Sequence, residues 1–356
     1  MAGLRTRAGS LCAAGLLAAQ IAAAVADDGT NLSATPTTDE IVLQNGSRIL
    51  GTVTATRDGV VTVETEFAGT LKIAQDKIQS MQTREAVVMK LRDGTVVEDQ
   101  QVVVQDTELV LPPSLVPAAP YSLADLAVMN PQPWELGDGY RWTGLASAAL
   151  TIEDGNTDTE EFDYKLESVW RSLRDRFTAK MVGEVDEANG VKNAENWKAN
   201  GKYDYFLKDP TYYTGMVGAA EADKFADLDL RYYIGPYLGH QFYEEPVLTL
   251  SGEVGAVYVN ENFIVADDKE YPGLNWTANA TSNILGGDSR LYFDHNGILN
   301  LDDASDLIMN TTFGLAFPLM FSIEAAAEVL LEYDSGVPPG VEEMDQTYRF
   351  RVGYTW

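Results

Sequence analysis

The feature that most constrains the fold of this chain is a persistent alternation of apolar and polar residues between positions 134 and 356. Successive side chains of a β-strand point to opposite faces, so this alternation predicts strands with one face in an apolar phase and the other in a polar phase. No apolar run in this region is long enough for a membrane-spanning helix. The pattern therefore predicts a transmembrane β-barrel. Its clearest apolar row, on the last predicted strand, consists of Tyr348, Phe350, Val352, Tyr354 and Trp356.

The aromatic residues are concentrated in the same region. Only Phe67 and Tyr121 precede residue 134, and the other 33 of the 35 aromatic residues lie within 134–356. Amphipathic aromatic rings gather at both interfaces of a barrel in a membrane. The girdle expected at the periplasmic strand ends comprises Trp142, Trp170, Phe177, Phe206, Tyr212, Tyr213, Tyr243 and Trp356. The girdle expected at the opposite ends comprises Tyr258, Tyr271, Trp276, Tyr333 and Tyr348.

Alternation and turn residues together predict an all-β fold with a twelve-stranded antiparallel barrel. The predicted strands are 141–152, 159–171, 175–187, 195–207, 211–221, 228–242, 246–260, 272–285, 288–299, 306–317, 319–333 and 345–356. Connections after even-numbered strands are expected to be short, and those after odd-numbered strands longer, as in 188–194, 261–271 and 334–344. Outer-membrane barrels have short periplasmic turns and longer outer loops, so this parity predicts that both barrel ends lie in the periplasm.

The segment before the barrel is predicted to form a small β module at 38–112, either a barrel or a sandwich. Short Val, Ile and Leu runs alternate there with turn signals, and a weak internal repeat relates 43–46 to 91–94 at an offset of 48 residues. A run of prolines predicts an extended linker at 113–133, and the barrel is assigned to 134–356. The residues leave open whether the module binds a periplasmic partner or is a folded spacer.

The first 26 residues have the pattern of a secretory signal peptide. Arg5 and Arg7 supply the positive region, 11–24 the apolar stretch, and Ala24-Val25-Ala26 the cleavage site. The single cysteine, Cys12, lies inside this segment, so the exported chain would have neither a disulfide nor a cysteine nucleophile. With 54 acidic residues against 25 Lys and Arg, the chain has a formal charge of −29, which argues against a nucleic-acid partner.

Several short motifs resemble those of an uncharacterised bacterial family described as salt-induced outer-membrane proteins. They are Asn45-Gly46 with Gly51, Glu66-Phe67-Ala68-Gly69 followed by Ile73 and Ile78, Trp142 leading to 155–159, and the aromatic C-terminus. Asp154 stands where the family pattern has Ser, which leaves the turn chemistry intact. The resemblance implies an outer-membrane location and a barrel architecture, with salt stress as the associated condition. It implies no established activity.

The polar faces of the predicted strands carry charges of both signs, which predicts a polar network in the lumen. Its members are Glu161, Asp163, Lys165, Glu167, Arg176, Lys180, Lys198, Lys202, Glu324, Glu328, Glu332, Arg349 and Arg351. The same rows also contain Arg171, Glu184, Asp186 and Asp204. Opposite charges on neighbouring strands can pair, so these side chains are expected to fill a narrow lumen. A selective polar pore is the alternative interpretation.

No catalytic, cofactor or metal site is predicted. The two imidazole bases, His240 and His295, are expected near opposite membrane levels. Asp294 precedes His295, but adjacent strand residues point to opposite faces, so this pair cannot share the lumen. The acidic stretches 267–270, 302–303 and 342–343 lack the spaced ligands of a dedicated Ca²⁺ loop.

These features together predict an outer-membrane β-barrel of structural, envelope-adaptation or small-solute channel type, with the N-terminal module in the periplasm. The expected partners are outer-membrane lipid, lipopolysaccharide and the barrel-assembly machinery, which would recognise the C-terminal apolar row. Two alternatives remain open. One is a membrane-embedded hydrolase acting on lipid or peptide, and the other is a soluble periplasmic β-rich binding protein.

Overall fold

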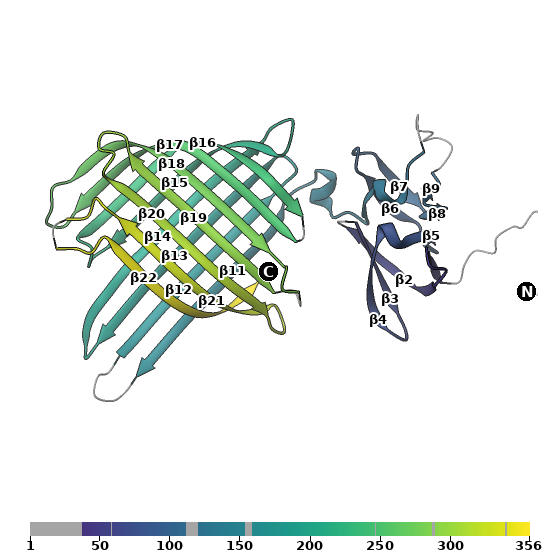
Figure 1. Ribbon diagram of the computed structural model, residues 1–356, viewed down its shortest axis with the longest axis horizontal. Helices are drawn as coiled ribbons and strands as arrows, with labels where there is room; N and C mark the ends of the chain where they lie inside the picture. Colours follow the sequence, from purple (N-terminus) through teal and green to yellow (C-terminus); the bar gives the residue numbers. More distant parts are fainter. Residues whose placement is uncertain are drawn as a thin grey trace, which may run out of the picture.

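The structure is a computed structural model that describes residues 38–57, 59–111, 120–153, 159–245, 247–286, 289–338 and 340–356. The predicted signal peptide at 1–26 lies outside these residues. The described chain forms two β units, a closed barrel and a smaller curled sheet that precedes it (Figure 1). Within the described ranges, no helix has both the length and the apolar character needed to cross a membrane.

The barrel closes through twelve antiparallel strands in chain order, so the predicted all-β class and strand number are confirmed. Each strand pairs with the next, and the last pairs with the first between Leu145–Thr355 and Ala148–Val352. The strands are β11 (Arg141–Glu153), β12 (Thr159–Arg171), β13 (Asp175–Ala188), β14 (Val191–Phe206), β15 (Tyr212–Asp223), β16 (Leu228–Glu245), β17 (Leu248–Phe263), β18 (Lys269–Ser282), β19 (Arg290–Asn300), β20 (Leu307–Pro318), β21 (Ile323–Asp334) and β22 (Met344–Thr355).

The connections between strands differ from the predicted contrast in length. Only Asn189 and Gly190 separate β13 from β14, because positive φ angles of 51° and 77° make a tight hairpin where a longer loop was predicted. Conversely, two connections that were predicted to be short are longer than the β13–β14 hairpin. Residues 283–289 connect β18 to β19, and residues 319–322 connect β20 to β21. The predicted strand start at 319 is wrong, because Phe321 and Ser322 adopt positive φ angles and form a turn.

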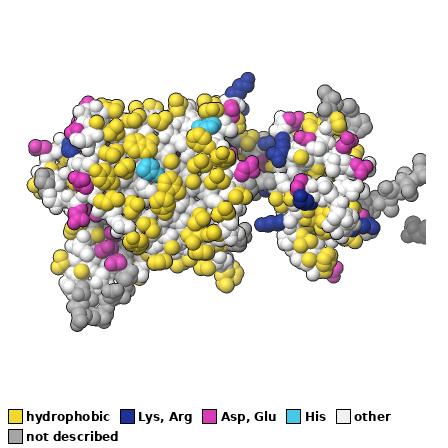
Figure 2. All heavy atoms as spheres, viewed as in Figure 1, with side chains coloured by type: hydrophobic (Ala, Val, Ile, Leu, Met, Phe, Trp, Pro, Cys, Tyr) yellow, Lys and Arg dark blue, Asp and Glu magenta, His cyan; other side chains and the backbone are white. Residues whose placement is uncertain are grey.

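Several aromatic side chains cluster at the end of the barrel where the chain enters and leaves it. Trp142 stacks on Trp170 with ring centroids 6.3 Å apart, and it meets Trp356 edge-on at 5.6 Å. Three predicted girdle members are misplaced, because Phe206, Tyr213 and Tyr271 are buried and hence are not interfacial. The outer wall of the barrel is covered by hydrophobic side chains (Figure 2).

The N-terminal module is confirmed as a separate β unit, and it consists of one curled sheet. Its ten strands are β1 (Asp39–Leu43), β2 (Arg48–Arg57), β3 (Val60–Thr65), β4 (Gly69–Ala74), β5 (Ile78–Gln82), β6 (Val87–Leu91), β7 (Val96–Gln100), β8 (Val103–Gln105), β9 (Glu108–Leu109) and β10 (Leu126–Met129). Its core includes Ile41, Val61, Met89, Leu91 and Leu126, all of which are fully buried.

The weak sequence repeat extends through the whole module. Short 3₁₀ helices η1 (Gln75–Lys77) and η3 (Leu123–Asp125) occupy equivalent positions at the offset of 48, directly before β5 and β10. β5 of the first half pairs with β8 of the second, and β10 of the second pairs with β2 of the first. Each of these last strands also pairs with the first strand of its own half, β5 with β1 and β10 with β6, so the last strands join the two half-units into one sheet.

The predicted linker at 113–133 needs correction. β10 lies inside the sheet between β6 and β2, so residues 126–129 belong to the module. The connection to the barrel is a short segment that includes η4 (Pro133–Leu136). Glu135 of η4 accepts a hydrogen bond from Arg57 at 3.0 Å, and Tyr140 donates one to Asp175 of the barrel at 3.3 Å. This segment is thus anchored at both ends, unlike an extended polyproline linker.

The turn at Gly46 and its repeat equivalent at Gly94 should respond alike to the same substitution. Gly46 and Gly94 have φ angles of 83° and 89°, and a Cβ at either position would meet no atom within 4 Å. Only the left-handed backbone would therefore penalise alanine, by about 1–2 kcal/mol. We expect Gly46→Ala and Gly94→Ala to lower the stability of the module by similar amounts. Amide hydrogen exchange of the full-length protein measures this, and very different effects would contradict the equivalence of the half-units.

Asp93, in the second repeat hairpin, predicts a pH effect. Its carboxylate accepts hydrogen bonds from the Tyr121 hydroxyl at 2.5 Å and from the Thr95 amide at 2.9 Å, and these bonds hold the pKa of Asp93 below its usual value. A depressed pKa gives stability that is present above about pH 4 and is lost as the pH falls through the folded-state value. Tyr121→Phe should raise the Asp93 pKa, which carboxyl NMR titration of the full chain measures. An unchanged pKa would contradict this account.

Candidate functional site

The lumen of the barrel contains charged side chains of both signs that pair with one another. Its midsection is organised around Glu328 of β21, whose side chain is almost fully buried. Glu328 accepts hydrogen bonds from Lys165 at 2.7 Å, from Tyr292 at 2.6 Å and from Arg351 at 2.9 Å. A buried carboxylate with several donors is stabilised in its charged form, so this midsection cluster ties β12, β19 and β22 to β21.

Two further arginine and carboxylate contacts extend the midsection cluster across the closing strands. Arg349 of β22 forms ion pairs with Asp163 of β12 at 2.7 Å and with Glu184 of β13. Both contacts pass over β11, which lies between β22 and β12 in the barrel order. The ion pairs therefore reinforce the place where the barrel closes.

At the barrel end where the chain enters, a second cluster surrounds Lys202, Arg176 and two tyrosines. Lys202 lies 2.5 Å from Glu253, which also accepts a hydrogen bond from the Tyr213 hydroxyl at 2.9 Å. Arg176 pairs with Asp204 at 2.5 Å. The second tyrosine, Tyr237, donates a hydrogen bond to Asp204. The tyrosines and acids come from β14, β15, β16 and β17, so four strands contribute to one buried polar layer.

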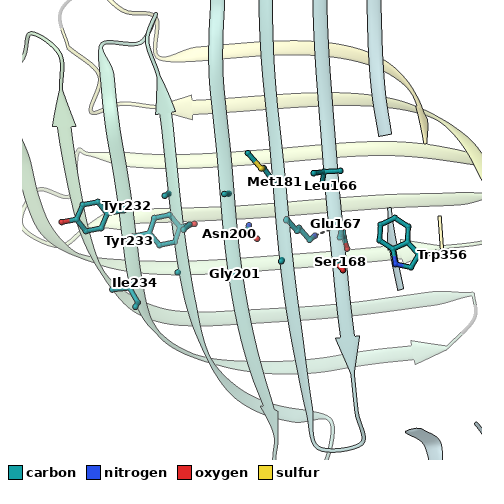
Figure 3. Close-up of a pocket in the computed structure, with 16 residues that line it drawn as sticks. Leu166, Glu167, Ser168, Met181, Asn200, Gly201, Tyr232, Tyr233, Ile234 and Trp356 are labelled. Carbon is teal, nitrogen blue, oxygen red and sulfur yellow. Dashed lines mark ion pairs between the residues drawn. The ribbon is translucent and has the colours of Figure 1, made fainter. Parts of the chain in front are cut away.

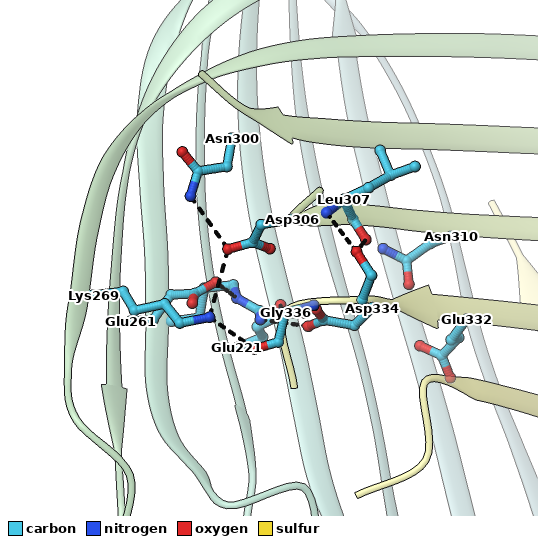
Figure 4. A network of polar contacts seen from close by, with 12 residues as sticks. Glu221, Glu261, Lys269, Asn300, Asp306, Leu307, Asn310, Glu332, Asp334 and Gly336 are labelled. Carbon is cyan, nitrogen blue, oxygen red and sulfur yellow. Dashed lines mark hydrogen bonds and ion pairs between the residues drawn. The ribbon is translucent and has the colours of Figure 1, made fainter. Parts of the chain in front are cut away.

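At the opposite end of the barrel, Arg231 of β16 is the centre of a third cluster. Its side chain is 8% exposed and forms ion pairs with Glu221 at 2.7 Å, Glu261 at 2.6 Å and Asp334 at 2.6 Å. Figure 4 shows the neighbouring contacts, in which Lys269 lies 3.5 Å from Asp306 and donates to the Gly336 carbonyl at 2.7 Å. These bonds hold the β21–β22 connection against the β19–β20 connection.

Contacts between opposite walls close the lumen near this end. β14 and β20 are six strands apart in the twelve-strand order, yet Lys198 of β14 donates to Asn310 of β20 at 3.3 Å. Lys198 also lies 2.5 Å from Glu332 of β21. Since a single side chain reaches from one wall to the other, no continuous wide passage remains at this level.

The structure places most of the predicted network residues in these clusters. Of the predicted members, Glu167 pairs with Lys180 at 3.5 Å, and Glu324 pairs with Arg290 at 3.1 Å. Glu161 is exposed and has no ion pair within the described part of the chain. Sequence reasoning missed Glu221, Arg231, Glu253, Glu261, Arg290 and Asp334, together with the lumen tyrosines. The same period-two parity applied to β15, β16 and β17 would have found several of them.

Neither histidine faces the lumen. His240 contacts Tyr212 in a tilted arrangement and Phe242 edge-on, on the outer wall, with ring centroids 4.3 and 4.6 Å away. His295 accepts a hydrogen bond from the Trp276 indole at 3.0 Å, and its other ring nitrogen contacts the Thr311 hydroxyl at 2.9 Å. Asp294 lines a lumen cavity, so the expected opposite orientation of Asp294 and His295 is present. In the part of the chain that the structure covers, no group of His, Cys, Asp or Glu is arranged to hold a metal.

A hollow lies on the outer wall of the barrel. It measures about 830 Å³, and small residues line part of it, Gly201 among them (Figure 3). Met181, Leu166 and Ile234 form its sides, so its surface is apolar. The C-terminal apolar row is also on this outer wall, and Phe350 within it is 80% exposed.

Removing the positive charge of Arg231 should strongly lower the stability of the barrel. Arg231→Met would leave three carboxylates facing one another in a buried site, which typically costs about 3–5 kcal/mol. Lys224→Met is the matched control, because Lys224 pairs with Glu195 on the surface and its side chain is 61% exposed. We expect less than about 1 kcal/mol for the control. Guanidinium unfolding of the refolded barrel measures both, and equal effects would show that the cluster is not a structural centre.

Comparison with known proteins gives a family match over the barrel. Residues 146–356 match the family described as "Protein of unknown function, DUF481". Among curated proteins, none matches.

Similar solved structures include "NanC porin structure in rhombohedral crystal form", with 12% identity and a TM-score of 0.38 over 60% of this chain and 98% of that chain. The translocator domain of the autotransporter NalP from Neisseria meningitidis has 11% identity and a TM-score of 0.36, with coverage of 62% and 88%. The KdgM porin has 12% identity and a TM-score of 0.32, with coverage of 61% and 98%.

Proposed function

The chain belongs to the family of proteins of unknown function DUF481, and we propose that it is an outer-membrane β-barrel that forms a small-solute channel held closed by ion pairs across its lumen. Contact between opposite walls carries this proposal, since Lys198 reaches both Asn310 and Glu332. A purely structural barrel could fill its lumen with apolar side chains, whereas this lumen is polar and charged along its length.

The outer wall supports a location in a membrane. Large apolar side chains such as Leu150, Ile234, Leu238, Val254 and Phe350 are more than half exposed on it. Such a surface in water would be an aggregation hazard, while lipid accommodates it. A closed antiparallel barrel also satisfies its backbone hydrogen bonds internally, which the hydrocarbon phase requires. These properties disfavour the soluble periplasmic binding protein.

The proposed membrane is the bacterial outer membrane, because barrels with an even number of antiparallel strands are typical of that membrane. In the proposed orientation both ends of the barrel chain and the N-terminal module lie in the periplasm. The C-terminal row Tyr348, Phe350, Val352, Tyr354 and Trp356 is proposed to be recognised by the barrel-assembly machinery, and the exposed outer loops are proposed to contact lipopolysaccharide. A role in envelope adaptation and induction by salt stay predictions.

The alternative of a membrane-embedded hydrolase has little support. A general base must reach the proton that it abstracts from a bound substrate. His240 and His295 point to the outer wall, and both nitrogens of His295 are engaged by Trp276 and Thr311. The described lumen carboxylates in the three clusters are engaged with cations or tyrosines, which is a stabilising arrangement and not one that leaves a nucleophile and a base free.

Conductance tests the closed channel. In planar bilayers the refolded protein should show little or no conductance, because the Lys198 contacts close the lumen. The variant Lys198→Ala/Glu332→Ala removes both partners of one pair, so it leaves no lone charge from that pair and opens space between β14 and β21. We expect at least a fivefold rise in single-channel conductance or open probability.

The matched control is Lys192→Ala/Glu195→Ala, which removes a lysine and glutamate pair 2.8 Å apart at the exposed β13–β14 hairpin. It should leave conductance at the level of the unmodified protein. Heat-modifiable gel migration shows that each variant has folded. If the lumen variant is folded and as silent as the control, the channel proposal is wrong, and a structural membrane anchor for the N-terminal module is the remaining function.

A further inference from the structure

A lumen cavity of about 110 Å³ lies next to the midsection cluster. Its lining includes Thr281 at the end of β18, Arg290 at the start of β19 and Glu324 at the start of β21. All three positions belong to the barrel end where the chain enters, so the cavity lies on that side of the midsection cluster. Small residues on the closing strands, Ser147, Ala326 and Gly353, leave the space open.

Two buried donors of the cavity have no partner. Arg351 is 3% exposed, and its Nε binds Glu328, but its Nη1 makes no hydrogen bond within the described residues. Ser147 is 9% exposed, and its hydroxyl likewise lacks a partner there. A buried polar group without a partner typically costs about 1–3 kcal/mol, so native proteins seldom leave two in one place. The pair of donors indicates that an acceptor occupies the cavity.

The charges around the cavity indicate which acceptor fits. Lys165, Lys180, Arg290 and Arg351 face Glu167, Asp294, Glu324 and Glu328, so cations and carboxylates are equal in number. Asp294 makes no hydrogen bond or ion pair to any side chain in the described ranges. An anion in the cavity would therefore lie near the Asp294 carboxylate, which has only a longer-range attraction to Lys180, and a bare cation would lie near the guanidinium groups. A ligand that carries both charges satisfies both sides.

We propose that this cavity binds a small zwitterion with a carboxylate and an ammonium group, such as a free amino acid of the size of glycine. The carboxylate accepts from Arg351 Nη1 and the Ser147 hydroxyl, and the ammonium group faces Asp294. The volume equals that of about four water molecules, which suits a ligand of few heavy atoms. If the barrel is the proposed channel, this ligand is the class of solute that it carries, and to that extent the inference rests on the proposed function. Binding of the ligand does not itself require conduction.

Equilibrium binding of glycine to the refolded full-length protein in detergent tests the site, with saturation-transfer NMR and calorimetry as readouts. Ala326→Leu fills the cavity without changing a charge, and Ser147→Ala removes one of the two free donors. We expect the first variant to weaken glycine binding at least tenfold and the second about fivefold. Ala325→Leu is the matched control, since its neighbouring position on β21 is outside the cavity, and binding should stay unchanged.

Two single-charge probes separate the ligand classes. Acetate carries only the carboxylate and methylammonium only the cation, and each should bind at least tenfold more weakly than glycine. If acetate binds as well as glycine, the site is an anion site and the zwitterion proposal is wrong. It is also wrong if folded Ala326→Leu and Ser147→Ala bind glycine normally, or if the unmodified protein binds none of the probes, because the cavity then holds only water. Conductance is measured in a separate experiment, so the binding results can still be interpreted if the protein turns out not to be a channel.

Discussion

The constraint on which the barrel depends is closure of its hydrogen-bond ladder. A sheet in a hydrocarbon phase cannot have an open edge, so β22 must return to β11. That closing ladder runs only from Leu145–Thr355 to Ala148–Val352, extended by mutual backbone bonds between Gly144 and Trp356, and every other neighbouring pair of barrel strands has a longer ladder. The Arg349 contacts with Asp163 and Glu184 cross this place, so the charges of the lumen contribute to closing the barrel as well as to filling it.

The twelve strands could be predicted from sequence because a period of two needs no knowledge of partners. Partners across the lumen could not be predicted in the same way. They depend on the register of every strand in between, and bulges such as those at Asp186/Glu187 in β13 and Gln241/Tyr243 in β16 shift that register. The contact of Lys198 with Glu332 therefore emerges only in three dimensions, although both residues were recognised as inward-facing from their parity.

The N-terminal module shows a different limit of sequence reasoning. Prolines between 112 and 133 indicated a linker, but the four residues Leu126–Met129 insert between strands from both half-units. A strand this short has too few residues for its alternation to stand out against its surroundings. The repeat contained the missing information, because Ile78–Gln82 occupies the equivalent position in the first half, where Ile78 and Met81 correspond to Leu126 and Met129 at the offset of 48. Extending a weak repeat over its full length is thus a better guide than the local proline content.

The midsection cluster links the closed lumen to the cavity beside it, since Glu328 and Arg351 belong to both. Glu328 binds the Arg351 guanidinium through Nε, while Nη1 has no partner among the described residues, and the Ser147 hydroxyl is a second unpartnered donor in the cavity lining. A carboxylate bound at Nη1 would compete with Glu328 and Asp163 for the same delocalised charge, and it would weaken the contacts that Lys165, Tyr292 and Arg351 now share. In the proposed complex, binding in the cavity and the contacts of the midsection cluster would therefore be coupled through one guanidinium group. The coupling must act in both directions, because whatever loosens the Glu328 contacts also frees Arg351 for a ligand.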